Sequence, residues 1–223
     1  MSRATPSANT VAPTIYLAGP MVFYEDLTVF DVMKHICAHH DLEGVSPLDN
    51  QIGLEGLAPG KPAVTKIVTA DFELMRKSDG GLFCLNPFRR GTEMDAGTAV
   101  EIGYMIGIGG KKIAGWSEDG RAYPEKVTDF FKGERIYTAR ANSKGGTSGS
   151  TRDPDGVLIH SEGLVQNGMV HCGIELHGGK VYAHKDWRAA FEAAAMDLAA
   201  QFDLVPKDPL HHSDRAAAAG LAT

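Results

Sequence analysis

Two carboxylates six positions apart are the first candidates for chemistry in this sequence. Asp95 and Glu101 are the first and last residues of the segment Asp95-Ala-Gly-Thr-Ala-Val-Glu101, and Thr98 lies midway between them. On a helix, residues three apart fall along one side of the first two turns, so both carboxylates would lie close to one cleft. Such a pair suits glycosidic bond cleavage: one carboxylate attacks the anomeric carbon, and another group handles the proton of the leaving base.

The same spacing has a plainer interpretation. Asp95 could merely cap the helix and Glu101 could be a solvated surface residue, and from spacing alone this is the commoner outcome. Three glycines at positions 97, 103 and 107 weigh modestly against it. Glycine lowers helix stability unless close packing or the approach of a ligand to the backbone requires it. The pattern therefore predicts a helix that packs tightly against something.

Alternating strands and helices must position these carboxylates. Hydrophobic periodicity, turn residues and helix caps define the elements. The expected strands are residues 14–18, 44–48, 80–85, 112–116 and 180–183, and the expected helices are residues 26–40, 62–77, 95–109 and 186–202. This order predicts an α/β fold: a flavodoxin-like, doubly wound, mainly parallel five-stranded sheet with helices on both faces.

Ligands of an open parallel sheet bind beyond the carboxyl ends of its strands. The segments that follow the first three strands are therefore the candidates for a binding site. They are rich in groups that could hydrogen-bond a sugar or a heterocycle, and they cover residues 19–23, 47–51 and 86–95.

The chain is expected to form one domain, residues 14–203. Residues 1–13 are small and polar and predict a flexible N-terminal extension, and residues 204–223 predict a flexible tail. Residues 139–163 are expected to be a mobile insertion, because their Gly, Ser and Thr content buries too little apolar surface to offset the entropy of ordering. No apolar run is long enough for a membrane span and no leader is evident, so a cytoplasmic enzyme is expected.

Composition argues against several kinds of partner and cofactor. A formal charge of −6 does not suit polymeric nucleic acid, which is bound through Lys and Arg. The chain has neither a G-x-G-x-x-G motif after its first strand nor a Walker loop, so no organic cofactor is expected. Cys37, Cys84 and Cys172 lack disulfide or zinc spacing. Metal binding is not expected either, because the adjacent histidines at 39–40 and 211–212 do not face one another on a helix and no carboxylate cluster accompanies them.

Four segments, in order along the chain, resemble the landmarks of the nucleoside 2-deoxyribosyltransferase family. They are Ile15-Tyr-Leu-Ala-Gly-Pro20 with Phe23, Asp71 before Leu74-Met-Arg-Lys-Ser-Asp79, Asp95-Ala-Gly-Thr-Ala-Val-Glu101-Ile-Gly-Tyr104, and Asn167-Gly-Met169. Each motif alone is weakly specific, whereas four in this order are strongly specific. The resemblance covers about residues 14–200 apart from the insertion, which replaces a short loop of the family.

The resemblance implies a role for each matching residue. Glu101 matches the nucleophile that forms a covalent deoxyribosyl intermediate, and Tyr16 matches the tyrosine that orients this carboxylate. Asp71 and Asp95 match the carboxyl groups that engage the base and manage its proton, with a division of labour that varies among members.

The remaining matches concern substrate binding. Gly19 and Phe23 fall in the first landmark, where Phe23 could either stack a base or pack in the core. Gln51 resembles a glutamine that contacts the base. Asn167 and Met169 resemble a pair contributed to the site of a neighbouring subunit, with the asparagine binding the 5′-hydroxyl. The resemblance thus implies a homo-oligomer with shared active sites.

The expected activity is transfer of 2-deoxyribose from a 2′-deoxynucleoside to a free nucleobase, with slow hydrolysis as a side reaction. One alternative is a 2′-deoxynucleoside 5′-monophosphate N-glycosidase, but the loop at 19–23 lacks the serine and arginine that would hold a phosphate. A second alternative is a non-catalytic nucleotide-sensing module. The presence of Tyr16, Asp71, Asp95 and Glu101 together counts against it.

Overall fold

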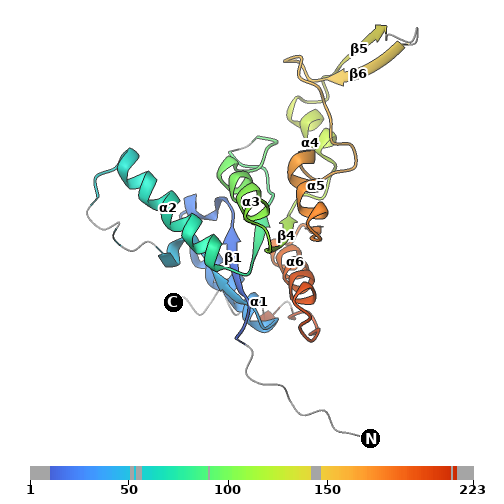
Figure 1. The fold of residues 1–223 in the computed structure, drawn as a ribbon. Coiled ribbons are helices and arrows are strands. Elements are labelled where there is room, and N and C mark those ends of the chain that lie inside the picture. Colours follow the sequence, from blue (N-terminus) through green and yellow to red (C-terminus); the bar gives the residue numbers. More distant parts are fainter. Residues whose placement is uncertain are drawn as a thin grey trace, which may run out of the picture.

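The computed structural model of the chain describes residues 11–50, 53, 57–89, 91–141, 147–211 and 213–214. Its body is a parallel sheet between two layers of helices, with one hairpin extending away from it (Figure 1). In the described part of the chain, no helix is long and apolar enough to cross a membrane.

Five parallel strands form the central sheet, in the order β2-β1-β3-β4-β7. They are β1 (Thr14–Ala18), β2 (Glu43–Val45), β3 (Gly80–Cys84), β4 (Lys112–Ser117) and β7 (Val181–Ala183). The doubly wound α/β fold expected from the sequence is therefore confirmed. The second strand is shorter than expected, because a 3-10 turn (Pro47–Asn50) follows it almost directly.

Helices cover both faces of the sheet. They are α1 (Thr28–His39), α2 (Lys61–Lys77), α3 (Ala96–Ile108), α5 (Gly168–Leu176) and α6 (Trp187–Gln201). The remaining helix, α4 (Tyr123–Phe130), forms a separate small cluster with Ile159, and a 3-10 turn (Pro20–Phe23) follows β1. Helices α1 and α6 pack on one face of the sheet, and α2, α3 and α5 pack on the other.

Alternation along β1 decides which side chains reach which face. Ile15 and Leu17 belong to the core beneath α1 and α6, whereas Tyr16 and Ala18 belong to the core beneath α2, α3 and α5. Successive side chains of a strand point to opposite faces. Tyr16 is therefore directed toward the layer of helices that contains the candidate carboxylates.

Helix α3 begins and ends as its sequence predicts. Asp95 is the N-cap, and its side chain accepts a hydrogen bond from the backbone N–H of Thr98 at 2.9 Å. Gly109 ends the helix in the left-handed region, at a φ of 72°, which glycine adopts without steric cost.

Strands β5 (Ile136–Ala141) and β6 (Thr147–Arg152) form an antiparallel hairpin, called the arm below. They pair with one another and not with the five-stranded sheet, and the arm extends away from the body (Figure 1). Most of the arm lies in the segment expected as a mobile insertion. Its strands were not predicted, because residues rich in Gly, Ser and Thr show no alternation of apolar and polar side chains.

The described residues after α6 make specific contacts with the body. Leu204 and Leu210 pack against the core beneath α1 and α6. The Lys207 ammonium lies 2.7 Å from a carboxylate oxygen of Asp41. Residues 204–211, expected from the sequence to be part of a flexible tail, therefore lie along α1 and α6.

Candidate active site

A hydrogen bond between Tyr16 and Glu101 joins the first strand to the third helix. The Tyr16 hydroxyl donates to Oε1 of Glu101 at 2.7 Å, across 85 positions of sequence. Tyr16 is fully buried, and Glu101 is partly buried in the second turn of α3. Burial and the neighbouring Glu101 and Asp71 carboxylates raise the pKa of the Tyr16 hydroxyl far above its ordinary value, so it remains a donor at all physiological pH values.

Two further carboxyl groups influence Glu101 electrostatically. Burial raises the pKa of Glu101 to about 7, and the nearby charges of Asp71 and Asp95 raise it too, against the lowering effect of the Tyr16 hydrogen bond. Burial raises the pKa of Asp71, in α2, to about 6. The electrostatic neighbours of Glu101 are therefore Asp71 of α2 and Asp95, the N-cap of α3.

Because their pKa values are raised, the carboxyl groups of Glu101 and Asp71 both titrate close to neutral pH. Glu101 exists in ionised and neutral forms, and Asp71 retains a protonated fraction in slightly acidic solution. A site with one ionised and one protonated carboxyl group can supply a nucleophile and an acid together.

The side chain of Asp95 accepts two hydrogen bonds from Thr98. The same oxygen, Oδ2, accepts the backbone N–H of Thr98 and, at 3.0 Å, the Thr98 hydroxyl. Asp95 is therefore a helix cap, as the plainer interpretation held. Glu101 is not the solvated residue of that interpretation, because it is bonded to a buried tyrosine.

A stacked pair of rings joins the helices that carry these acids. Phe72 and Tyr104 lie 4.2 Å apart between ring centroids and only 6° from parallel. Phe72 directly follows Asp71, and Tyr104 lies three positions after Glu101. The stack therefore fixes the spacing of α2 and α3 where their carboxyl groups meet. Sequence reasoning did not identify this contact, although the periodicity of each helix places both residues near the core.

The end of β1 approaches β3 closely and leaves an aromatic side chain exposed. A Cβ atom on Gly19 would lie 2.6 Å from Cβ of Cys84, so a larger residue would push the strand ends apart. Phe23, four positions later, is 62% exposed, and its ring lies 5.7 Å from that of Phe88. The possibility that Phe23 is a core residue is therefore wrong. Phe88 was not predicted, since it lies in an irregular loop.

Asn167 and Met169 are not joined to this cluster within one chain. Asn167 caps α5, and its side chain accepts the backbone N–H of Met169 at 3.0 Å. The Met169 side chain is 87% exposed. Gln51, expected to contact the base, lies outside the described residues.

None of the three helix glycines packs against another element of the described chain, although the sequence had suggested that they would. A Cβ atom on Gly103 or Gly107 would meet no other atom of the chain within 4 Å, and Val100 beside them is 59% exposed. Only at Gly97 would it meet a neighbour closely, 2.9 Å from Oδ2 of Asp95. Within a single chain this face of α3 is open, so the expected tight packing is not met.

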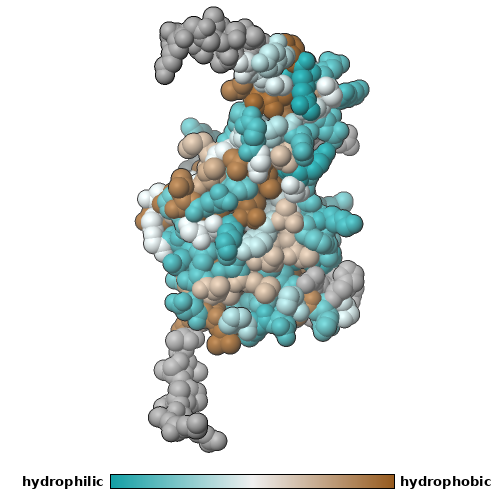
Figure 2. Space-filling model, turned by 90° about the vertical axis from the view of Figure 1, so that its right-hand side faces the viewer, coloured by the Kyte–Doolittle hydropathy of each residue, from teal (hydrophilic) through white to brown (hydrophobic). Residues whose placement is uncertain are grey.

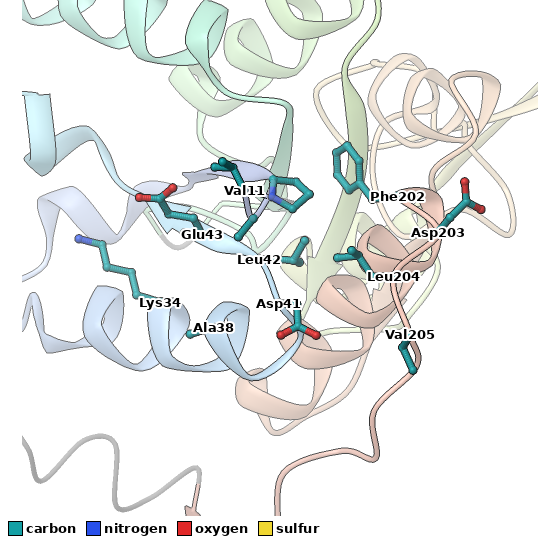
Figure 3. A pocket seen from close by; sticks show the side chains of 13 residues that line it. Val11, Lys34, Ala38, Asp41, Leu42, Glu43, Phe202, Asp203, Leu204 and Val205 are labelled. Carbon is teal, nitrogen blue, oxygen red and sulfur yellow. The ribbon is translucent and has the colours of Figure 1, made fainter. Parts of the chain in front are cut away.

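A hollow of about 1020 Å³ lies elsewhere, at the amino end of the sheet (Figure 3). Residues of α1, β2 and the segment after α6 line it, among them Lys34, Glu43 and Leu204. None of the residues predicted for the active site borders this hollow. The hollow is therefore separate from the carboxyl groups of the candidate active site.

Comparisons with known proteins find a matching family, a related sequence and a similar fold. The sequence model of the nucleoside 2-deoxyribosyltransferase family matches residues 15–169. This range contains every residue that the sequence predicted for the active site. An uncharacterized protein of Schizosaccharomyces pombe is 44% identical over 192 residues, which is 86% of this chain and 90% of that protein. A solved 2-deoxyribosyltransferase from Leishmania mexicana is 25% identical, covers 82% of this chain and 97% of its own, and superimposes with a TM-score of 0.55.

Proposed function

The chain belongs to the nucleoside 2-deoxyribosyltransferase family, and from this premise we propose that it transfers 2-deoxyribose between nucleobases through a covalent intermediate on Glu101. The observation that carries the proposal is the hydrogen bond from buried Tyr16 to Glu101, in a cluster with Asp71 and Asp95. Family membership supports a nucleoside and a nucleobase as substrates.

In the first step, the ionised carboxylate of Glu101 attacks C1′ of the deoxynucleoside. The electrons of the C1′–N bond pass to the base, which leaves with a proton from a nearby acid, and a glutamyl ester forms. In the second step, an incoming base gives its N–H proton to the same, now deprotonated, group, attacks C1′ and releases the carboxylate. Two inversions give net retention, and water in place of the second base gives slow hydrolysis.

A deoxysugar suits this route. The transition state resembles an oxocarbenium ion. Because the electron-withdrawing 2′-hydroxyl is missing, 2-deoxyribose carries this positive charge more readily than ribose.

Tyr16 positions the nucleophile and favours its ionised form. Its hydroxyl donates to one carboxylate oxygen, Oε1, and so fixes the orientation of the carboxyl group. The same bond opposes the rise in the Glu101 pKa that burial causes. Without it, a smaller fraction of Glu101 would be ionised at neutral pH.

Asp71 is the acid that we assign to the leaving base. Its pKa of about 6 keeps part of the population protonated where Glu101 begins to ionise. Asp95 is held by Thr98 and contacts the base from a fixed position. The exposed ring of Phe23, together with its partly buried neighbour Phe88, would stack on the base.

A second copy of the chain would complete the site. Asn167 and Met169 lie at the start of α5 and would reach the 5′-hydroxyl in a neighbouring subunit. The helices of this layer expose apolar side chains, and α3 packs against both α2 and α5. These side chains are Val64, Ile67 and Val68 of α2, Val100 and Ile108 of α3, and Met169 and Leu176 of α5. Figure 2, a view onto the side that carries α5, shows apolar surface at mid-height below the arm.

A base-exchange assay tests the proposal. The chain is incubated with a 2′-deoxynucleoside and a different free base, and the products are separated by chromatography. We expect a new deoxynucleoside with wild type and with Glu134→Gln, a control at an exposed carboxylate. Glu101→Gln should lose exchange by roughly a thousandfold or more, since no nucleophile remains. Exchange by Glu101→Gln at the wild-type rate would refute the mechanism.

The same assay separates the two other activities. Hydrolysis of a 2′-deoxynucleoside 5′-monophosphate without exchange would indicate an N-glycosidase. Tight binding of a nucleoside without any turnover would indicate a sensing module.

A further inference from the structure

Two adjacent histidines at the end of α1 lie beside a glutamate of α6. His39 is the last residue of α1, and His40 is already outside helical geometry, with φ of −95° and ψ of 22°. Their rings lie 4.8 Å apart between centroids, nearly perpendicular to one another. Glu192, 152 positions after His40, completes the group, and one potential ligand atom from each residue lies within 4.8 Å of the others.

We propose that His39, His40 and Glu192 form a binding site for a divalent transition metal of the zinc type, which fastens the segment after α6 to the body. Two imidazoles and one carboxylate are a donor set that zinc accepts, with water in the fourth position. Magnesium and calcium prefer sites built from oxygen ligands alone.

The spacing of two ligands already suits such an ion. Nε2 of His40 and Oε1 of Glu192 are 3.2 Å apart. Two atoms bound to one tetrahedral zinc at its usual bond lengths are about 3.4 Å apart. One ligand atom of His39 already lies within 4.8 Å of the other two, so a small shift of its ring would bring in the third ligand.

Burial and outer contacts support the site. His40 and Glu192 are almost completely buried. Nε2 of His39 lies 2.9 Å from the carbonyl oxygen of Asp208, and the backbone N–H of Leu210 donates to Oε1 of Glu192 at 2.6 Å. A backbone carbonyl that accepts from one ring nitrogen of a histidine leaves the other nitrogen for a metal, an arrangement typical of metal sites.

The segment after α6 therefore provides the outer contacts of the site. Asp208 and Leu210 hold ligands that come from α1 and α6, and His211 and Asp214 border the same hollow as His39. An ion would join three parts of the chain that are distant in sequence. Its role is structural, because this face of the sheet is opposite to the one that carries Glu101.

Metal binding at this site exchanges protons for the ion. Nε2 of His40 and Oε1 of Glu192 lie within hydrogen-bonding distance of each other, 3.2 Å apart. Zn²⁺ binds neutral imidazole and ionised carboxylate, so protons compete with the ion for these ligands. Binding should therefore weaken as pH falls.

The test uses the full chain, freed of any purification tag and of bound metal by a chelator. Zn²⁺ is titrated by calorimetry, and Co²⁺ is titrated by visible absorption, which reports tetrahedral coordination. The variants are His39→Asn and Glu192→Gln. His35→Asn is the matched control, since His35 is exposed on α1 one turn before His39.

We expect wild type and His35→Asn to bind one Zn²⁺ per chain, with the absorption of tetrahedral Co²⁺ and a higher Tm. His39→Asn should fold normally and bind Zn²⁺ at least about tenfold more weakly. Glu192→Gln should lose the Co²⁺ absorption. Wild type without stoichiometric binding, or His39→Asn with unchanged affinity, would overturn the proposal.

Discussion

The Tyr16 hydroxyl and a Glu101 carboxylate oxygen lie 2.7 Å apart, in the first strand and the third helix of the chain. The sheet places them together because Tyr16 is on the face of β1 that α3 covers. The bond links the ionisation of Glu101 to a fully buried hydroxyl. The electrostatics of the proposed nucleophile can therefore be changed from the strand, without altering the helix that carries it.

Tyr16→Phe removes the hydrogen bond and preserves the ring. A hydrogen bond to a charged group contributes roughly 1.5–3 kcal/mol, so we expect base exchange at neutral pH to fall about 10- to 100-fold. The Glu101 pKa should rise further above 7, which makes the loss smaller in alkaline solution. Rates measured from pH 6 to 9 check both effects. An equal loss at every pH would contradict the proposed effect on ionisation.

The pH profile of kcat/KM should be bell-shaped, with its maximum between the two raised pKa values. Only chains with Glu101 ionised and Asp71 protonated are active, so activity rises until Asp71 starts to ionise near 6 and falls once Glu101 is ionised above about 7. Because the two carboxyl groups interact, the limbs belong to the pair. Asp71→Asn should be at least about a hundredfold slower and lack the alkaline limb. Retention of that limb would assign the acid to another group.

Glu101→Gln should be more stable than wild type in alkaline solution. The folded-state pKa of Glu101, about 7, is above its ordinary value, so the folded chain binds the proton more tightly than the unfolded chain. This contribution is present at low pH and is lost as pH rises through about 7. Urea unfolding at pH 5 and pH 8 should show an advantage for the glutamine variant only at pH 8.

Asp95 has two roles that different substitutions separate. Asn is as good an N-cap as Asp, so Asp95→Asn should preserve the free energy of unfolding while slowing exchange. Asp95→Ala should also lose about 1 kcal/mol of stability. Urea denaturation and the exchange assay measure the two roles. Full activity of Asp95→Asn would limit Asp95 to capping.

The open face of α3 should be a contact between subunits. Val100→Glu places a charge there and is expected to give a folded monomer with little activity, because the neighbour's Asn167 is lost. Val205→Glu, at a residue that is 78% exposed in the segment after α6, is the matched control and should keep the wild-type assembly. Sedimentation velocity gives the oligomeric state. An active wild-type monomer would contradict the shared site.

Much of the fold follows from local sequence signals. Short continuous apolar runs bounded by turn residues predict the buried strands, and Asp95 and Gly109 define the ends of α3, since caps act on neighbouring residues. The proposed site was recognised by the order of its motifs. Carboxylate spacing alone could not decide whether Glu101 was solvated, because that depends on Tyr16, which lies 85 positions earlier.

Contacts between elements that are distant along the chain could not be predicted from the sequence. Glu192 approaches His40 only because α1 and α6 share one face of the sheet. The sequence analysis therefore weighed metal binding by His39 and His40 without this carboxylate. Phe88 meets Phe23 through two irregular segments that have no periodicity. Among the residues that the structure describes, none of the three glycines of α3 packs against another element, since Gly97 meets only the capping Asp95 side chain and Gly103 and Gly107 meet no atom within 4 Å.

The arm enters and leaves at one place, because Ile136 and Arg152 are paired across its base. Residues paired in this way have Cα atoms only about 5 Å apart, so a tight turn could replace everything between them. The register of β4 and β7 would be unaffected, as neither strand bonds to the arm. This connection is therefore a natural point for shortening the protein, or for grafting a foreign peptide, while the five-stranded sheet is left intact.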